Sequence, residues 1–123
     1  MTGTQKTILV VDDEPSILET VAEFLQLSGY DVLTATNGNE GLQAMQQRTP
    51  DLVLSDIMMP EVDGIELVRK LREMPEYKDI PILVLSGEGS GDLRVALKAG
   101  ANLALRKPLV PDALIQTIKE MIV

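Results

Sequence analysis

Short apolar runs alternate with amphipathic stretches along the whole chain. Each apolar run is followed by a turn and then by residues whose apolar members recur at helical spacing, and this unit occurs five times. The runs expected to form strands are residues 7–11, 31–35, 52–55, 80–86 and 102–106. Strands that alternate with helices in this way predict an α/β fold, in which a parallel sheet carries helices on both faces.

The first and fourth runs are apolar without interruption. Residues 8–11 read Ile-Leu-Val-Val and residues 82–85 read Ile-Leu-Val-Leu, with no polar residue between them. An antiparallel strand with one wet face would alternate apolar and polar residues instead. The continuous runs therefore indicate strands that are buried on both faces, as expected of a parallel sheet.

Proline and glycine mark several of the expected helix ends. Pro15 and Pro111 suit the first position of the first and last helices, because the N–H that proline lacks would have no intrahelical partner there. Gly29 is expected to end the first helix, and Gly100 to end a fourth helix that begins near Asp92.

Capping boxes predict where the second and third helices begin. Asn37 with Glu40, and Asp63 with Glu66, have the spacing at which the side chains satisfy free N–H groups at a helix start. The apolar residues expected to face the core are Ile17, Leu18, Val21, Phe24 and Leu25 in the first helix, Leu42 and Met45 in the second, Ile65, Val68 and Leu71 in the third, and Leu114, Ile115, Ile118 and Ile122 in the last.

Polar residues follow or end four of the five predicted strands. Because the carboxyl ends of parallel strands meet at one edge of a sheet, where such folds place their ligands, these side chains are expected to lie close together. They are Asp12 and Asp13 after the first strand, Asp56 after the third, Ser86 at the end of the fourth and Lys107 after the fifth.

Three neighbouring carboxylates repel one another unless a cation joins them. Oxygen ligands favour a hard ion such as Mg²⁺, which takes few carboxylates and keeps several waters. Asp56 would then be a carboxylate nucleophile that forms an aspartyl phosphate. Lys107 would offset charge on the phosphoryl group, and Ser86 would donate a hydrogen bond to it. The pattern predicts Mg²⁺-dependent phosphoryl transfer to Asp56.

Composition excludes several other classes of site. The chain of 123 residues has no cysteine and no histidine, which removes disulfides, thiolate metal sites and histidine-based acid–base catalysis. Acidic residues outnumber basic ones 19 to 11, giving a net charge of −8 that argues against direct nucleic-acid binding. The apolar runs are too short for membrane insertion, and the first seven residues lack a signal peptide's apolar segment. We expect one cytoplasmic domain over residues 1–123, with a core of about 6–122.

Four segments carry a family resemblance. "VVDDEP", "LVLSDIMMPEVDGIEL", "ILVLSG" and "LRKP", in this order and spacing, resemble the receiver domain of two-component response regulators. The resemblance covers essentially the whole chain and implies a flavodoxin-like fold, (βα)5 doubly wound, with strand order 2-1-3-4-5. It also implies a stand-alone receiver whose output comes from a partner.

The resemblance also implies residue roles and partners. Asp56 would accept a phosphoryl group from a phosphohistidine of a sensor histidine kinase or a histidine phosphotransfer protein. An unidentified downstream effector would bind in response, and a homodimer is one arrangement that the family allows. Such a chain catalyses only its own phosphorylation and dephosphorylation and is not a conventional enzyme. The implied ligands of Mg²⁺, for which Mn²⁺ may substitute, are Asp12, Asp13, Asp56 and the backbone carbonyl of Met58; the implied phosphoryl contacts are Ser86 and Lys107.

One position departs from the family pattern. Ala104 stands where receivers usually have a Tyr or Phe that moves when the hydroxyl of the fourth strand is drawn to the phosphoryl group. We therefore expect the signal to travel through the glycine-rich segment 87–91 to the fourth helix. Glu88 lies where the family tunes the rate of phosphoryl loss to water.

Three other classes fit the pattern less well. A haloacid-dehalogenase-type phosphatase, a small Mg²⁺-dependent enzyme that forms an aspartyl phosphate, needs a second Asp where this chain has Met58. A flavodoxin-like electron carrier needs a phosphate loop after the first strand, where this chain has acids, and aromatics, which are 2% here. A pseudo-receiver adaptor that is not phosphorylated would not need all five strand-end residues.

Overall fold

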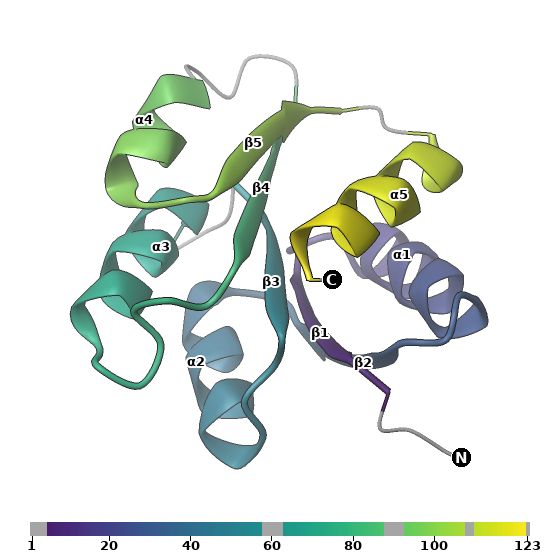
Figure 1. Ribbon diagram of the computed structural model, residues 1–123, viewed down its shortest axis with the longest axis horizontal. Helices are drawn as coiled ribbons and strands as arrows, with labels where there is room; N and C mark the ends of the chain where they lie inside the picture. Colours follow the sequence, from purple (N-terminus) through teal and green to yellow (C-terminus); the bar gives the residue numbers. More distant parts are fainter. Residues whose placement is uncertain (1–4, 58–62, 88–92, 108–109, 123) are drawn as a thin grey trace.

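The structure is a computed structural model that describes residues 5–57, 63–87, 93–107 and 110–122. Strands and helices alternate throughout, as predicted (Figure 1). The elements are β1 (Thr7–Val11), α1 (Pro15–Leu27), β2 (Asp31–Ala35), α2 (Gly38–Gln47), β3 (Leu52–Asp56), α3 (Gly64–Glu73), β4 (Ile82–Ser86), α4 (Leu93–Ala99), β5 (Leu103–Arg106) and α5 (Pro111–Met121).

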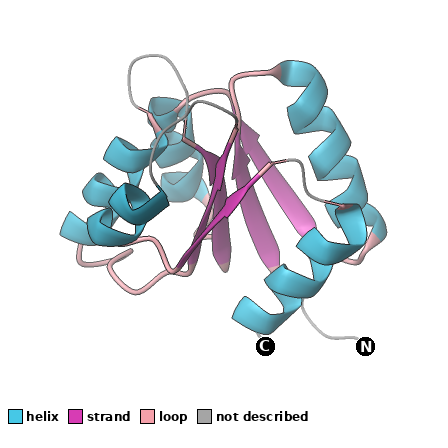
Figure 2. Ribbon diagram, turned by 90° about the horizontal axis from the view of Figure 1, so that it is seen from above, coloured by secondary structure: helices cyan, strands magenta, loops and turns pink. Residues whose placement is uncertain are grey.

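The five strands form one parallel sheet in the order β2-β1-β3-β4-β5, which confirms the predicted fold class and strand order. Helices α1 and α5 cover one face, while α2, α3 and α4 cover the other (Figures 1 and 2). All residues of β1 and β4 are buried, whereas the edge strands β2 and β5 are mostly only partly buried. The uninterrupted apolar runs therefore belong to strands covered on both sides.

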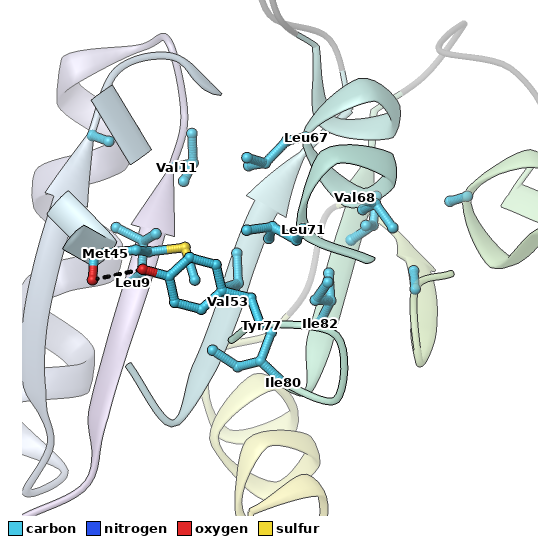
Figure 3. Close-up of a cluster of buried hydrophobic side chains, with 14 of the residues drawn as sticks. Leu9, Val11, Met45, Val53, Leu67, Val68, Leu71, Tyr77, Ile80 and Ile82 are labelled. Carbon is cyan, nitrogen blue, oxygen red and sulfur yellow. Dashed lines mark hydrogen bonds between the residues drawn. The ribbon is translucent and has the colours of Figure 1, made fainter. Parts of the chain in front are cut away.

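Alternate residues of each central strand feed two separate cores, because successive side chains point to opposite faces. On the face of α2, α3 and α4, Leu9 and Val53 pack against Met45 and Leu71 (Figure 3). The hydroxyl of Tyr77 reaches into this core and donates a hydrogen bond to the Met45 carbonyl oxygen at 3.1 Å. The core beneath α1 and α5 is formed by Ile8, Val10, Leu18, Leu25, Leu52, Leu54, Leu83, Leu85, Leu114 and Ile118.

The capping residues lie where the sequence places them. The side chain of Asn37 accepts a hydrogen bond from the Glu40 N–H at 2.8 Å, and that of Asp63 accepts one from the Glu66 N–H at 2.9 Å. The Glu40 carboxylate does not complete the box at Asn37. It accepts hydrogen bonds from the N–H and the hydroxyl of Thr36, one residue earlier.

The prediction that Phe24 faces the core is wrong. Phe24 is 39% exposed, and the buried residues of α1 are Leu18, Ala22 and Leu25. These three are spaced by four and three residues, so they define the stripe that faces the sheet. Phe24 lies on the flank of that stripe, where neighbouring elements cover it only in part.

Several element boundaries differ from the prediction by one or two residues. Strand β4 begins at Ile82 rather than at residue 80, because Pro81 has no N–H to donate to the ladder. Strand β5 begins at Leu103 rather than at 102. The Asn102 side-chain oxygen accepts a hydrogen bond from the Ile82 N–H at 2.8 Å, so a side chain supplements the ladder at this end.

Within the ranges that the structure describes, no helix has both the length and the apolar character needed to cross a membrane.

Candidate functional site

Four strands deliver polar residues to one edge of the sheet. Asp12 follows β1, Asp56 ends β3 and Ser86 ends β4. Lys107 follows β5, and its backbone N–H donates a hydrogen bond to the Ser86 carbonyl oxygen at 2.8 Å. The parallel register thus brings together segments that are up to 95 residues apart in the sequence.

Three carboxylates gather at this edge. Asp12, Asp13 and Asp56 each offer an oxygen, and these atoms lie within 4.8 Å of one another. Asp12 is buried, Asp13 is exposed and Asp56 is intermediate, so the cluster reaches from the sheet to the surface. Such a set of oxygen ligands fits a hard divalent cation, which replaces the mutual repulsion of the carboxylates with attraction.

Lys107 lies against the same carboxylates. Its Nζ atom is 3.4 Å from Oδ2 of Asp12 and 3.4 Å from Oδ2 of Asp56. Charge-assisted hydrogen bonds are usually shorter, about 2.7–2.9 Å. The lysine therefore supplies a nearby positive charge to both acids without a tight bond to either, and it offsets only part of their charge.

The environment of Asp56 disfavours its ionised form. Burial raises the pKa of Asp56 above its ordinary value, and the negative charge of Asp12 raises it further. The ammonium of Lys107 lowers that pKa, through its charge and a hydrogen bond, but does not reverse the shift. A second cation near Asp56 would therefore stabilise the carboxylate that acts as the nucleophile in our sequence-based prediction.

Asp12 is held in place by the turn between β1 and α1. Its Oδ1 atom accepts a hydrogen bond from the Glu14 N–H at 3.0 Å, and its own N–H donates to the Ala35 carbonyl oxygen of β2 at 3.1 Å. These bonds leave Oδ2 directed toward Lys107. The turn fixes one carboxylate oxygen by local structure and presents the other to the site.

Ser86 is fully buried at the end of β4. Its hydroxyl donates a hydrogen bond to the Gly87 carbonyl oxygen at 3.3 Å. The backbone hydrogen bond from Lys107 places it beside the fifth strand end, at the same edge as the carboxylates. Met58, Glu88 and residues 89–91, to which the sequence assigned further roles, lie outside the described residues.

Gly64 is a contributor to the site that the sequence reasoning missed. The sequence pattern predicts only a helix cap at the neighbouring Asp63 and assigns no functional role to Gly64. A Cβ atom at position 64 would overlap the backbone carbonyl oxygen of Asp56 and would lie 2.9 Å from the Ile57 Cα. The Gly64 N–H also donates to the Ile57 carbonyl oxygen at 2.9 Å. Glycine therefore lets the start of α3 lie directly against the backbone that carries Asp56.

Ala104 lies on the face of the sheet that α4 covers. It is partly buried and packs against the core beneath α2, α3 and α4, opposite Val84 in the ladder. The same core includes Ala96 and Ala99 of α4, and α4 and β5 are in contact.

Comparison with known proteins gives a consistent result. Residues 8–119 match the family described as response regulator receiver domain. The phosphate regulon transcriptional regulatory protein PhoB of Pseudomonas aeruginosa is 39% identical over 118 residues, which are 95% of this chain and 52% of that protein. The transcriptional regulatory protein PrrA of Mycobacterium tuberculosis is 41% identical over 120 residues, covering 97% of this chain and 51% of that protein.

Among solved structures, the chemotaxis response regulator CheY4 of Vibrio cholerae superimposes with a TM-score of 0.88 at 35% identity. The match covers 96% of this chain and 99% of the CheY4 chain. This chain thus spans about half the length of the two regulators above and has nearly the same extent as CheY4.

Proposed function

Since the chain belongs to the response regulator receiver domain family, we propose that Asp56 accepts a phosphoryl group and that this modification controls the binding of a partner protein. The observation that carries the proposal is the contact of Lys107 with both Asp12 and Asp56 at the carboxylate cluster. An anionic nucleophile and a cation able to face the incoming phosphoryl oxygens lie side by side there. Phosphoryl transfer requires mainly such positioning and charge neutralisation.

In the proposed reaction, a carboxylate oxygen of Asp56 forms a bond to phosphorus. The bond between phosphorus and the imidazole nitrogen of a phosphohistidine breaks, and that nitrogen keeps the electron pair. When the phosphoryl group is later lost, water attacks phosphorus and the bond to Asp56 breaks, which leaves the Asp56 carboxylate. Inorganic phosphate leaves with the oxygen and both hydrogens of the water, as dihydrogen phosphate. The chain returns to its starting state, so it is modified rather than acting as a conventional enzyme.

Asp12, Asp13 and Asp56 are the described residues that would hold Mg²⁺, or Mn²⁺ in its place, and the backbone carbonyl of Met58 is the remaining proposed ligand. The ion supplies positive charge that reduces repulsion between the acids and the incoming phosphoryl group. Lys107 then pairs with one phosphoryl oxygen, and the hydroxyl of Ser86 turns from the Gly87 carbonyl to donate to another.

The proposed signal runs through α4. With a methyl group at position 104, no aromatic ring is present there to change its rotamer. Movement of Ser86 would therefore pass along the following segment to α4, which is in contact with β5. Amide chemical shifts of residues 87–100 should change on phosphorylation, and unchanged shifts would exclude this route.

The proposed partners are a sensor histidine kinase or a histidine phosphotransfer protein as donor, and a separate effector as receiver of the signal. These assignments rest on membership of the family, and a cytoplasmic location is proposed with them. The net charge of −8 supports a protein partner rather than direct contact with nucleic acid.

Intact mass spectrometry tests the proposal. After incubation with Mg²⁺ and acetyl phosphate, we expect one phosphoryl group on the wild type and none on Asp56→Asn. Asp112→Asn, which changes an exposed acid in α5, is the matched control and should be phosphorylated like the wild type. An unmodified wild type would contradict the proposal, and consumption of the donor by a wild type on which no phosphoryl group is found would indicate a phosphatase instead.

A further inference from the structure

A cavity of about 200 Å³ lies between the sheet and the helices α1 and α5, which cover the same face (Figure 1). It differs from the phosphoryl site in that most of its wall is apolar. Its apolar lining comes from three strands and both helices and includes Val10, Leu54, Leu85, Ile17, Val21 and Leu114.

The end of the cavity at the carboxyl edge of the sheet is charged. Asp12, Asp56 and Lys107 line it there, with side chains that are 7%, 11% and 25% exposed. Two carboxylates and one ammonium leave this end with a net negative charge. Asp13, whose carboxylate is near the other two, adds to it. A positively charged group is therefore complementary to this end, whereas a second anion would have only Lys107 as a partner.

The whole cavity, including its charged end, is of a size that accommodates one small aromatic molecule. A cavity of about 150 Å³ lined by aliphatic and aromatic side chains is known to exclude water and to bind benzene. Within the apolar walls, water would have few hydrogen-bond partners. A ring-sized apolar group in contact with Ile17, Val21 and Leu114 would gain dispersion contacts and remove apolar surface from water.

We propose that this cavity binds a small primary amine with an apolar body, such as an arylalkylamine. Its ammonium group pairs with the carboxylates of Asp12 and Asp56 alongside the ammonium of Lys107, which already contacts both, and its ring lies between α1 and α5. The proposal goes beyond phosphoryl transfer and does not require that Asp56 be phosphorylated. Where a divalent cation occupies the same carboxylates, each ligand weakens the binding of the other by the same factor.

The two wall residues of α1, Ile17 and Val21, are spaced by four residues and present one face of the helix to the cavity.

Three probes separate the contributions of head group and body. Titration with 2-phenylethylamine, without divalent cations, should shift the methyl NMR signals of Ile17, Val21 and Leu114 saturably. Ethylamine, which lacks the ring, and 3-phenylpropionate, which carries a carboxylate, should each bind at least about tenfold more weakly. Equal or tighter binding of 3-phenylpropionate would overturn the charge argument, and equal binding of ethylamine would overturn the role of the cavity.

Two variants test the location. Val21→Phe fills the cavity from α1 and should weaken 2-phenylethylamine binding about tenfold, while Leu27→Phe, at an 80% exposed position of the same helix, should not change it. Asp56→Asn, which keeps the side-chain size, should weaken the amine severalfold even if Val21→Phe does not fold. Unchanged affinity in Asp56→Asn would overturn the proposal. Failure of phosphorylation with intact amine binding would contradict only the phosphoryl-transfer function.

Discussion

The surroundings of Asp56 disfavour the ionised form of its carboxyl group. Burial and the neighbouring Asp12 raise its pKa, and Lys107 compensates only in part. A group whose pKa is raised by folding stabilises the native state while it is protonated. That contribution is lost as the pH rises through the folded-state pKa. Without a bound cation, the ionised form of Asp56 therefore lowers the free energy of unfolding once the pH is above that folded-state pKa.

Replacing Asp56 with Asn should remove this pH dependence. In the absence of divalent cations, the free energy of unfolding of the wild type should fall relative to Asp56→Asn. The fall begins as the pH rises above the ordinary carboxyl value of 3.8 and ends above the folded-state pKa. Urea unfolding followed from about pH 3.5 to 7 measures the difference. Parallel curves for the two proteins would contradict this cause of the shift, and Asp112→Asn should follow the wild type.

The contact between Gly64 and Asp56 makes a second prediction for a single residue. Gly64→Ala forces the start of α3 away from the Asp56 carbonyl oxygen and should lower the free energy of unfolding by about 1–3 kcal/mol. Gly87→Ala is the matched control, because a Cβ atom there would meet no other atom within 4 Å. Denaturant unfolding measures both. Equal stability of the two variants would show that the contact is relieved at no cost.

At the scale of elements, Arg72 connects α3 to two loops at the amino ends of β4 and β5. Its guanidinium donates to the carbonyl oxygens of Gly100, Tyr77 and Lys78 and to the Asn102 side-chain oxygen, at 2.8–3.2 Å. Burial lowers the pKa of Arg72, whereas the charge of Asp79 raises it. One side chain thus satisfies four acceptors on loops that the sheet alone does not fix.

Removing this guanidinium should loosen those loops. Arg72→Met keeps the length of the side chain, removes one donor from each of four acceptors and should lower the free energy of unfolding by about 2–4 kcal/mol. Two of these acceptors, the Tyr77 carbonyl and the Asn102 side-chain oxygen, still accept from the N–H groups of Ile80 and Ile82. Arg72→Lys should restore little of it, because an ammonium cannot reproduce the planar fork. Arg69→Met, at an exposed position of α3, should change little. Denaturant unfolding and hydrogen exchange at residues 100–102 provide the measurements. An Arg72→Lys variant as stable as the wild type would refute the geometric argument.

For the molecule as a whole, the carboxylate cluster couples metal binding to folding. The oxygens of Asp12, Asp13 and Asp56 come together only in the native state, so a cation bound there stabilises that state alone. Mg²⁺ at about a hundredfold above its Kd should add about 2.7 kcal/mol to the free energy of unfolding. A thermal melt with and without Mg²⁺ measures this. An equal rise in Asp13→Ala would count against the site, and Ca²⁺ provides a test of selectivity.

The sequence predicted the fold and the membership of the strand-end cluster for one reason. In a parallel sheet all carboxyl ends share an edge, so a residue's place at a strand end fixes where it lies without knowledge of the helices. Asp12, Asp56, Ser86 and Lys107 were placed correctly at that edge because each ends or follows an apolar run. The caps at Asn37 and Asp63 were also predicted, since their hydrogen bonds span only three residues.

What only the tertiary structure decided depends on how the helices lie on the sheet. Three features were not predictable from any local pattern: the exposure of Phe24, the close approach of Gly64 to Asp56 and the four contacts of Arg72. Each depends on how near segments that are distant in the sequence come to one another. The cavity between α1 and α5 is of the same kind, because its volume depends on side chains from five elements at once. Periodicity fixes which face of an element is apolar, but the packing of several faces decides where space remains.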